Sequence, residues 1–213
     1  MAKPGQSSGK AVGLGPGFAH ETGRPAPLCG VDEAGRGPWA GPVVAAAVIL
    51  DPARLPEGID DSKKLSETAR EKLAQGIRET ALVGIGAASV AEIAQFNILG
   101  ASLLAMRRAV LALPRPPAFA LIDGKHCPKG LPCPAEALVD GDALSLSIAA
   151  ASIIAKVVRD RAMQRLSLRY PAYAWQKNKG YGTKAHQQGL LAAGACPHHR
   201  LSFAPLEPWR PKM

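Results

Sequence analysis

LCGVDEAGRGPWAGPVVAAAVIL, residues 28–50, is the segment that indicates the fold of this chain most clearly. Two apolar runs, Leu28–Ala34 and Val43–Leu50, flank a segment rich in glycine and proline, and this pattern predicts two strands joined by a turn. Two acidic residues, Asp32 and Glu33, stand inside the first apolar run. Charges in a buried strand cost free energy unless they are paired or bind a metal. The pair therefore marks a candidate functional site.

Neighbouring residues in a regular strand point to opposite faces of the sheet. Asp32 and Glu33 can reach one site only near a strand end or a distortion, and the turn Gly35-Arg36-Gly37 directly after them offers such an end. The alternative is an edge strand whose acidic side chains are solvated.

The rest of the chain predicts strands that alternate with helices. Helices are expected at 67–80 (after Ser66), 98–113, 143–169 and 183–193, and further strands at 82–89, 118–122 and 137–139. A hairpin followed by this alternation indicates a mixed α/β sheet with helices packed on it. Residues 1–27, rich in Gly, Pro, Ser and Lys, are expected to form a flexible leader before a single domain of residues 28–213.

The net charge of +9 is unevenly distributed along the 213 residues. Residues 1–142 hold 15 Lys/Arg and 15 Asp/Glu, whereas residues 143–213 hold 11 Lys/Arg and only 2 acids. Such a basic third suits a surface that faces the phosphates of nucleic acid, although a merely basic, soluble tail region would have the same composition.

Two classes of protein are disfavoured by the composition. No apolar run approaches the roughly 18 residues of a membrane span, and no secretory signal is recognisable, so we expect a cytoplasmic protein. The four cysteines show no C-x-x-C spacing and are expected to be reduced, with a disulfide between Cys127 and Cys133 left open.

Three further acidic segments, at 60–61, 123 and 140–142, stand where strands end or helices begin. Asp123 follows an apolar strand, a common place for ligand chemistry in α/β sheets, although Asp-Gly alone is also typical of a turn. Asp142 is expected to be the N-cap of the helix that begins at Ala143, a role compatible with binding a metal. Carboxylates that converge without His or Cys favour Mg²⁺ or Mn²⁺, and two such ions promote phosphodiester cleavage.

Seven segments, in order, resemble bacterial ribonuclease HII, and together they cover about residues 29–205. The segments are GVDEAGRGPWAGPVVAAAVIL (30–50), DDSKKLS (60–66), LIDG (121–124), VDGD (139–142), IAAASIIAKVVRD (148–160), NKGYGTKAH (178–186) and HHRLSFAPL (198–206). The resemblance implies an RNase H-like α/β fold, a mixed sheet flanked by helices, with a C-terminal helical extension.

The resemblance implies an endoribonuclease that cleaves the RNA strand of RNA–DNA hybrids. It also implies incision at single ribonucleotides in duplex DNA, at the phosphate 5′ of DNA or of the next ribonucleotide, leaving 5′-phosphate and 3′-hydroxyl ends. The implied role is removal of misincorporated ribonucleotides and RNA primers during replication and repair. The implied acidic site holds two Mg²⁺ or Mn²⁺ ions on Asp32, Glu33, Asp123 and Asp142. Asp140 is a poorer candidate because the family pattern has its acid after Gly141.

Substrate contacts are also implied by the resemblance. Gly35, Arg36 and Gly37 correspond to a sensor of the ribose 2′-hydroxyl, and Tyr181 to a tyrosine that stacks at the RNA–DNA junction. The other expected contacts are Lys63, Lys64, Ser152, Lys156, Lys179 and Thr183, the last at a helix start that suits a phosphate. Each lysine is equally compatible with a solvated surface charge, and residues 179–183 with a simple Gly-rich turn.

A monomer without an obligate protein partner is expected. Two rival functions remain: a nucleic-acid-binding protein that has lost catalysis, and a metal-dependent nuclease that acts on all-DNA duplexes.

Overall fold

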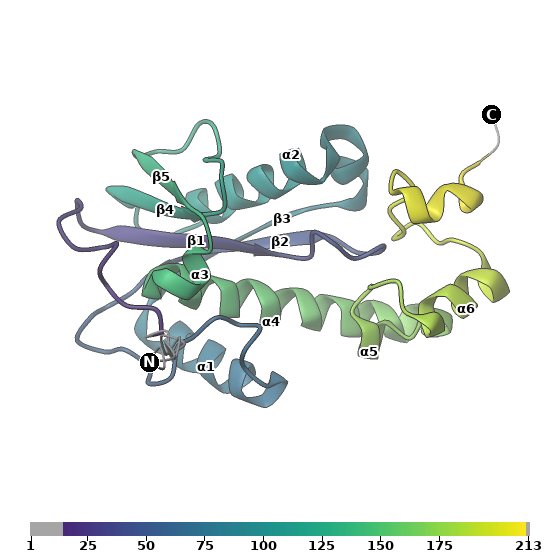
Figure 1. Ribbon diagram of the computed structural model, residues 1–213, viewed down its shortest axis with the longest axis horizontal. Coiled ribbons are helices and arrows are strands. Elements are labelled where there is room, and N and C mark those ends of the chain that lie inside the picture. The colour runs from purple at the N-terminus through teal and green to yellow at the C-terminus, as the bar shows by residue number, and fades with distance from the viewer. Residues whose placement is uncertain (1–14, 212–213) are drawn as a thin grey trace, which may run out of the picture.

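The computed structural model describes residues 15–211, and its centre is a five-stranded mixed sheet in the order β3-β2-β1-β4-β5 (Figure 1). Its strands are β1 (Leu28–Ala34), β2 (Val43–Ile49), β3 (Leu82–Ala88), β4 (Phe119–Asp123) and β5 (Ala135–Leu138). β1 and β3 run antiparallel to β2, whereas β4 runs parallel to both β1 and β5. The predicted hairpin and the mixed α/β sheet are therefore confirmed.

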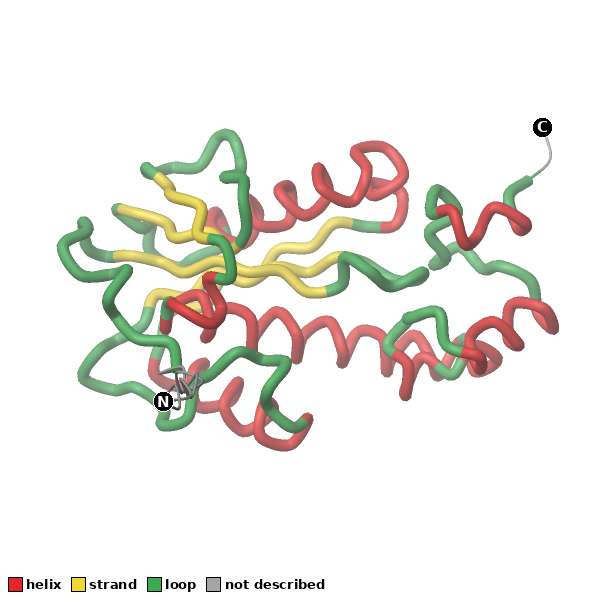
Figure 2. Tube along the Cα trace, in the orientation of Figure 1, coloured by secondary structure: helices red, strands yellow, loops and turns green. Residues whose placement is uncertain are grey.

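Helices cover both faces of the sheet and extend beyond one of its ends. They are α1 (Glu67–Thr80), α2 (Val90–Leu111), α3 (Gly141–Leu144), α4 (Leu146–Arg169), α5 (Trp175–Asn178) and α6 (Lys184–Ala193), with 3₁₀ turns η1 (Pro171–Tyr173) and η2 (Ala204–Trp209). α2 lies on one face, and α4 with α1 on the other (Figure 1). The far end of α4 projects past the sheet and carries α5, α6 and η2, the helical extension expected at the C-terminus (Figure 2).

The sheet and the helices pack closely because the residues between them are small. All seven residues of β2 are buried, and they alternate between the cluster under α2, which includes Ala45, and the cluster under α4, which includes Ala46. Gly30 of β1 lies against α4 so closely that a Cβ there would be 2.1 Å from the carbonyl carbon of Ser147. The long central helix is thereby held directly against the strand that carries the first acidic pair.

The helix expected at 143–169 is divided into α3 and α4, and this division corrects the role predicted for Asp142. Ser145 is the N-cap of α4, where its hydroxyl accepts a hydrogen bond from the Ile148 N–H at 3.2 Å. The prediction that Asp142 caps this helix is therefore wrong: Asp142 lies inside α3. Because Ser145 satisfies the N-terminus of α4, the carboxylate of Asp142 is available for other contacts.

α2 begins earlier than the expected helix at 98–113. Ser89 and Glu92 form a capping box at its start, a signal that the apolar periodicity alone does not contain. Asn97 then interrupts the helix with a φ of 56°, and its side-chain oxygen accepts from the Leu99 N–H at 2.9 Å. The expected helix corresponds to the second part of α2.

Part of the expected leader contacts the domain. Residues 1–14 of that segment lie outside the described residues. Of the remainder, Gly17 bridges to Ser145, and Glu21 Oε1 accepts from the Ser145 hydroxyl at 2.7 Å and from the Ser147 N–H at 3.0 Å. Residues 17–21 therefore pack at the start of α4 instead of extending away from it, because Glu21 satisfies free N–H and O–H donors there.

Two further expectations concern the chain as a whole. The four cysteines are free thiols. Within residues 15–211, no helix combines the length and the apolar character that crossing a membrane requires.

Candidate active site

Asp32 and Glu33 lie near the end of β1 and point to opposite faces of the sheet. Asp32 is paired with Ala46 and Glu33 with Ala45, and these two alanines belong to the clusters under α4 and α2 respectively. Both acids are largely buried: Asp32 is 6% exposed and the Glu33 side chain 8%. They can serve one site only if the sheet is open beside them.

The neighbouring strand provides that opening because it ends at Asp123. The parallel pairing of Val31 with Ile122 places Asp123 level with Asp32. The chain then turns at Gly124, so β4 leaves space beside the last residues of β1. The predicted position of Asp123 at the tip of a central strand is observed.

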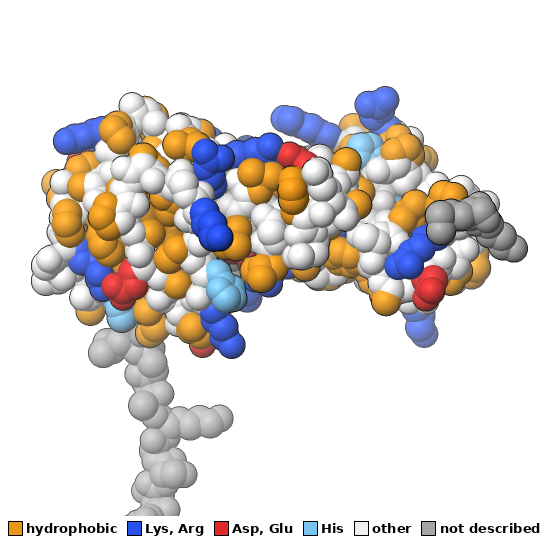
Figure 3. Space-filling view, turned by 90° about the horizontal axis from the view of Figure 1, so that it is seen from above, with side chains coloured by type: hydrophobic (Ala, Val, Ile, Leu, Met, Phe, Trp, Pro, Cys, Tyr) orange, Lys and Arg blue, Asp and Glu red, His pale blue; other side chains and the backbone are white. Residues whose placement is uncertain are grey.

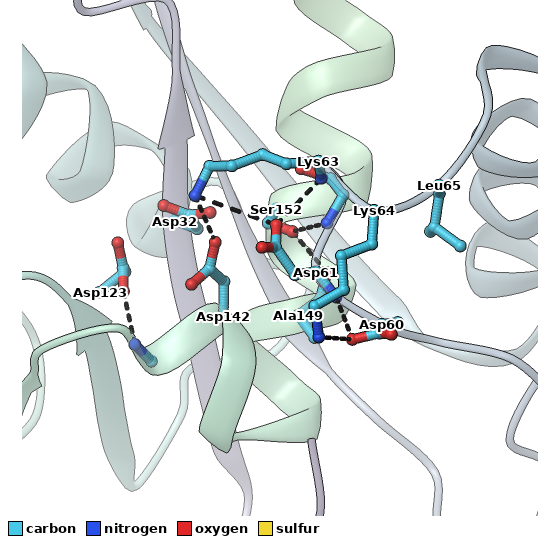
Figure 4. A network of polar contacts seen from close by, with 12 residues as sticks. Asp32, Asp60, Asp61, Lys63, Lys64, Leu65, Asp123, Asp142, Ala149 and Ser152 are labelled. Atoms are coloured by element: carbon cyan, nitrogen blue, oxygen red, sulfur yellow. Dashed lines mark hydrogen bonds and ion pairs between the residues drawn. The ribbon is translucent and has the colours of Figure 1, made fainter. Parts of the chain in front are cut away.

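Asp142 reaches the same region from α3. Asp123 Oδ1 accepts a hydrogen bond from the Gly141 N–H at 2.8 Å, which fixes α3 beside the end of β4. Figure 4 shows Asp32, Asp123 and Asp142 facing one another below the side chain of Lys63. Lys63 Nζ lies 2.8 Å from Asp142 Oδ2.

Burial and the charges of neighbouring acids raise the pKa values of Asp32, Glu33 and Asp123. Burial raises the pKa of Asp32 well above its usual value, and the charges of Glu33, Asp123 and Asp142 raise it further. Burial likewise raises the pKa of Glu33, while Arg36, whose Nη1 lies 3.3 Å from Glu33 Oε1, opposes this effect. Burial and the charge of Asp142 raise the pKa of Asp123. The cluster is therefore electrostatically unfavourable without added positive charge.

Lys63 supplies part of that positive charge. The hydrogen bond with Asp142 raises the pKa of Lys63, and the charges of Asp142, Asp61 and Asp32 add to this effect. The side chain of Lys63 is nevertheless 78% exposed. The acids thus attract the ammonium group of Lys63, although this exposed side chain is not held in place among them.

The donor set fits a hard divalent cation. Within residues 15–211, no three His, Cys, Asp or Glu side chains are already gathered tightly enough to enclose an ion. The four acids nevertheless offer only oxygen donors, repel one another and attract an ammonium group. Mg²⁺ and Mn²⁺ prefer such oxygen ligands.

A pocket of about 260 Å³ adjoins the acids and gathers many of the residues predicted to bind substrate. Its lining is Asp32, Glu33, Ala34, Gly35, Arg36, Gly37, Ser62, Lys63, Asp123, Ser152, Lys156, Arg159 and Tyr181. Asp142 does not line it but contacts its Lys63. The tyrosine ring lies beside the turn, since a Cβ on Gly37 would be 3.6 Å from Tyr181 Cε1.

Three residues predicted to contact substrate are absent from this lining. Lys64 Nζ pairs with Asp60 Oδ1 at 3.0 Å, and Lys179 Nζ pairs with Glu67 Oε1 at 3.3 Å. Thr183 is the N-cap of α6, as expected. Asp140 has a φ of 55° and makes no side-chain capping hydrogen bond.

A second pocket, of about 420 Å³, lies on the α2 side of the acids. It shares Glu33, Arg36 and Asp123 with the first pocket and adds Leu103 and Met106 from α2. The acidic cluster therefore lies between two pockets, because Asp32 and Glu33 point to opposite faces of the sheet.

Two buried arginines near the site were not predicted. Arg159 is 1% exposed and Arg200 is fully buried, and both donate hydrogen bonds to backbone carbonyls of residues 35–42. The only signal in the sequence is an arginine within an apolar helix for the first and the His-His-Arg segment for the second. Neither signal indicates burial, because arginine is usually exposed.

Basic side chains are prominent on one face of the molecule. Figure 3 shows one face of the molecule, on which Lys and Arg side chains are spread over the larger part and the C-terminal part with few acids between them. This distribution suits a polyanionic ligand.

The chain is similar to known proteins over nearly its whole length. The model of a family described as Ribonuclease HII matches residues 29–206. A ribonuclease HII of Rhizorhabdus wittichii is 58% identical over 192 residues, covering 90% of this chain and 95% of that protein. A ribonuclease HII of Jannaschia sp. is 53% identical over 193 residues, covering 91% of this chain and 97% of that protein.

Solved structures show the same fold. The crystal structure of ribonuclease H2 from Pyrococcus horikoshii has a TM-score of 0.68 and 25% identity, covering 85% of this chain and 95% of that one. RNase HII from Archaeoglobus fulgidus, solved in a complex with PCNA, has a TM-score of 0.67 and 27% identity, covering 87% of this chain and 96% of that one. A structure of Bst-RNase HIII in complex with Mn²⁺ has a TM-score of 0.66 at 23% identity, covering 84% of this chain and 68% of that one.

Proposed function

The chain belongs to the ribonuclease HII family, and on that basis we propose that Asp32, Glu33, Asp123 and Asp142 are its catalytic, metal-binding residues. Members of this family are divalent-metal-dependent endonucleases that cleave RNA in RNA–DNA hybrids and remove ribonucleotides from DNA. This chain is an endonuclease of the same kind. The assignment of the four acids to its active site is the proposal.

One observation carries the proposal. Acids from β1, β4 and α3, far apart in the sequence, converge beside one pocket, and the charges of the other three acids raise the pKa of Asp32. A folded protein retains such repulsion at a cost in stability, and active sites are where this cost is commonly found.

We propose that the four carboxylates hold two ions, Mn²⁺ or Mg²⁺. Such a pair, when bound, activates water for attack on a phosphodiester and stabilises the leaving oxygen. The hydrogen bond from the Gly141 N–H orients the carboxylate of Asp123, and Arg36 restrains that of Glu33.

The lining of the first pocket supports the assignment of different residues to the sugar, the base and the phosphates of the substrate. The Gly35–Gly37 turn would recognise the ribose 2′-hydroxyl, and Tyr181 would stack on the adjoining nucleotide. Lys63, Ser152 and Lys156 would contact the phosphates near the cleaved bond. We assign Lys64, Lys179 and Thr183 to the flanking duplex, since they lie outside this lining.

We also propose that the protein acts as a monomer in the cytoplasm without an obligate protein partner. Residues 28–213 are proposed to form a single catalytic domain preceded by a leader, and the convergence of all four acids on one sheet and its helices supports this proposal.

The experiment that tests the proposed function uses a labelled DNA duplex with one embedded ribonucleotide. Wild type and Asp32→Asn are incubated with Mg²⁺, with Mn²⁺ and with chelator, beside an all-DNA duplex and a long RNA–DNA hybrid. The proposal predicts a metal-dependent cut at the ribonucleotide by wild type only, with all-DNA uncut.

Other outcomes of that experiment are informative. Cutting of only the long hybrid would retain the nuclease and remove the activity on single ribonucleotides. Equal cutting of all-DNA would favour a nuclease without a 2′-hydroxyl sensor. Binding without cleavage would indicate a nucleic-acid-binding protein that has lost catalysis.

A further inference from the structure

Arg200 is fully buried, and its guanidinium group donates all of its hydrogen bonds to a single loop. Its guanidinium makes five hydrogen bonds of 2.6–3.1 Å, and all five acceptors are backbone carbonyl oxygens. These acceptors belong to Gly35, Arg36, Pro38, Gly41 and Pro42. The loop they form leads from β1 to β2 and contains the proposed sensor of the 2′-hydroxyl.

The direction of these carbonyls fixes the direction of the amide groups. In a trans peptide, the C=O of one residue and the N–H of the next point in opposite directions. Since the carbonyls of Gly35 and Arg36 point at Arg200, the N–H groups of Arg36 and Gly37 point away from it. Both residues line the pocket beside the acids.

The Pro38–Trp39 peptide of the same loop has the same arrangement of its carbonyl and N–H groups. The Pro38 carbonyl accepts from Arg200 at 2.8 Å, and the following N–H, that of Trp39, donates in the other direction to the Gly180 carbonyl at 2.8 Å. Within residues 15–211, by contrast, the N–H groups of Arg36 and Gly37 have no acceptor. They are the donors that remain for a ligand in the pocket.

A second buried arginine joins this loop to the segment that carries Tyr181. Arg159 donates to the carbonyls of Pro42 at 3.1 Å, Ala40 at 3.2 Å and Lys179 at 3.0 Å. It also packs under Gly35, where a Cβ would be 1.9 Å from Arg159 Nε. The sensor turn and the stacking tyrosine are therefore held by one scaffold.

The scaffold has an electrostatic cost. Neither Arg200 nor Arg159 forms a salt bridge with an acid in the described part of the chain. Burial lowers the pKa of both guanidinium groups, and the charge of Arg159 lowers the pKa of Arg200 further. Two buried cations that donate their side-chain hydrogen bonds only to backbone carbonyls stabilise a fold at a high cost in free energy, but they fix the orientation of the peptides that accept those bonds.

We propose that Arg200 is a positioning residue for ribonucleotide recognition, which holds the N–H groups of Arg36 and Gly37 toward the pocket beside Asp32 and Glu33. Arg200 itself does not touch the substrate. The inference rests on the proposed function, because it assumes that this pocket receives the ribonucleotide.

The test separates recognition from cleavage by using a catalytically inactive background. Arg200→Lys is combined with Asp32→Asn, and the affinity for a duplex with one ribonucleotide is compared with the affinity for the all-DNA duplex. Lysine keeps the charge but lacks the planar fork. The preference for the ribonucleotide duplex should fall about tenfold, the size expected from one lost hydrogen bond, with all-DNA binding unchanged.

Arg210→Lys is the matched control. Arg210 is an exposed arginine of the same C-terminal region that also donates to backbone carbonyls, those of Leu201 and Ser202. Its replacement should leave the preference at the level of the Asp32→Asn protein. The preference should fall only when the arginine that holds residues 35–42 is changed.

Two results would overturn the inference: an unchanged preference in Arg200→Lys, or an equal loss of affinity for both duplexes, which would make Arg200 merely structural. Thermal melting verifies that the variant folds. If it does not, Arg159→Lys, which loosens the same loop at Ala40 and Pro42, is judged by the same two results. Failure of the proposed function would be recognised separately, because the Asp32→Asn protein would then cleave the ribonucleotide duplex as well as wild type does.

Discussion

Nζ of Lys63 lies 2.8 Å from Oδ2 of Asp142 and forms an ion pair with this carboxylate. Lys63 is 78% exposed while Asp142 is 8% exposed, which leaves the lysine able to move away and the acid in place. The ammonium group of Lys63 thus offsets part of the negative charge of the acids. Lys63 also lines the pocket in which we propose that a phosphate of the substrate lies.

Lys63→Met is therefore expected to bind Mn²⁺ more tightly than wild type does in the absence of nucleic acid. The lysine competes with the ion for Asp142, and an ion pair this exposed is worth at most about 1 kcal/mol, so the gain should be roughly threefold to fivefold. Calorimetric titration with Mn²⁺ measures it. Lys64→Met, whose lysine pairs with Asp60 instead, should not change Mn²⁺ affinity, and weaker binding by Lys63→Met would contradict the competition.

Asp32→Asn is expected to abolish cleavage while stabilising the metal-free protein by about 1–2 kcal/mol. Asp32 is buried among the charges of three other acids, and asparagine removes its charge at nearly constant volume. Urea unfolding monitored by circular dichroism, in chelator, measures the gain.

Asp140→Asn is the control for that prediction. Asp140 stands two residues before Asp142 but makes no capping hydrogen bond, and asparagine tolerates its φ of 55°. Cleavage and stability should both stay at wild-type levels. A destabilised Asp32→Asn would show that the cluster is not under electrostatic strain.

Replacement of Tyr181 separates stacking from hydrogen bonding. The side chain is 49% exposed beside the sensor turn, and loss of one base–aromatic stack costs about 1–3 kcal/mol. Tyr181→Ala should lower kcat/KM on the embedded ribonucleotide by roughly 5-fold to 150-fold, whereas Tyr181→Phe should stay close to wild type. If Phe is as poor as Ala, the hydroxyl rather than the ring carries the contact.

The C-terminal extension should make stability depend on pH through His199. Burial, assisted by the charge of His186, lowers the pKa of His199 from 6.5 to about 4. The unfolded chain then binds more protons than the folded one between those two values. Stability should fall as the pH drops from about 6.5 to about 4, by at most about 3 kcal/mol, and change no further below that window through this group.

The measurement for this prediction is the free energy of unfolding between pH 7.5 and pH 4. Protonation of the acidic cluster acts in the opposite sense, because it relieves repulsion. The difference between wild type and His199→Gln therefore reports the contribution of His199 together with its contact to His186. The exposed His126 provides the control variant His126→Gln, which should follow the wild-type curve. A His199→Gln curve parallel to wild type would contradict the assignment.

The sequence predicted the elements that local pattern determines. The apolar runs around Asp32 and Glu33 became β1 and β2, and the acid at the end of the next strand, Asp123, lies level with Asp32. The seven segments resembling ribonuclease HII predicted the family, which the comparisons confirm. The apolar pattern of the strands and the position of acids at their ends were sufficient to predict these elements and the place of Asp123.

Contacts between distant residues could not be predicted in the same way. The role of Asp142 as a helix cap was wrong because Ser145, three residues later, offers the better-placed hydroxyl. The packing of Glu21 on α4 and the burial of Arg200 depend on partners more than 100 residues away. Local composition does not encode such pairs, and the residues that orient the sensor turn were missed for this reason.

The most direct test of the four-carboxylate site is a crystal of the protein soaked in Mn²⁺ and measured for anomalous scattering. The four-carboxylate assignment predicts anomalous density between Asp32, Glu33, Asp123 and Asp142, with Lys63 displaced from Asp142 and no density there in an Asp32→Asn crystal. Density bound elsewhere, with these four side chains unliganded, would contradict it.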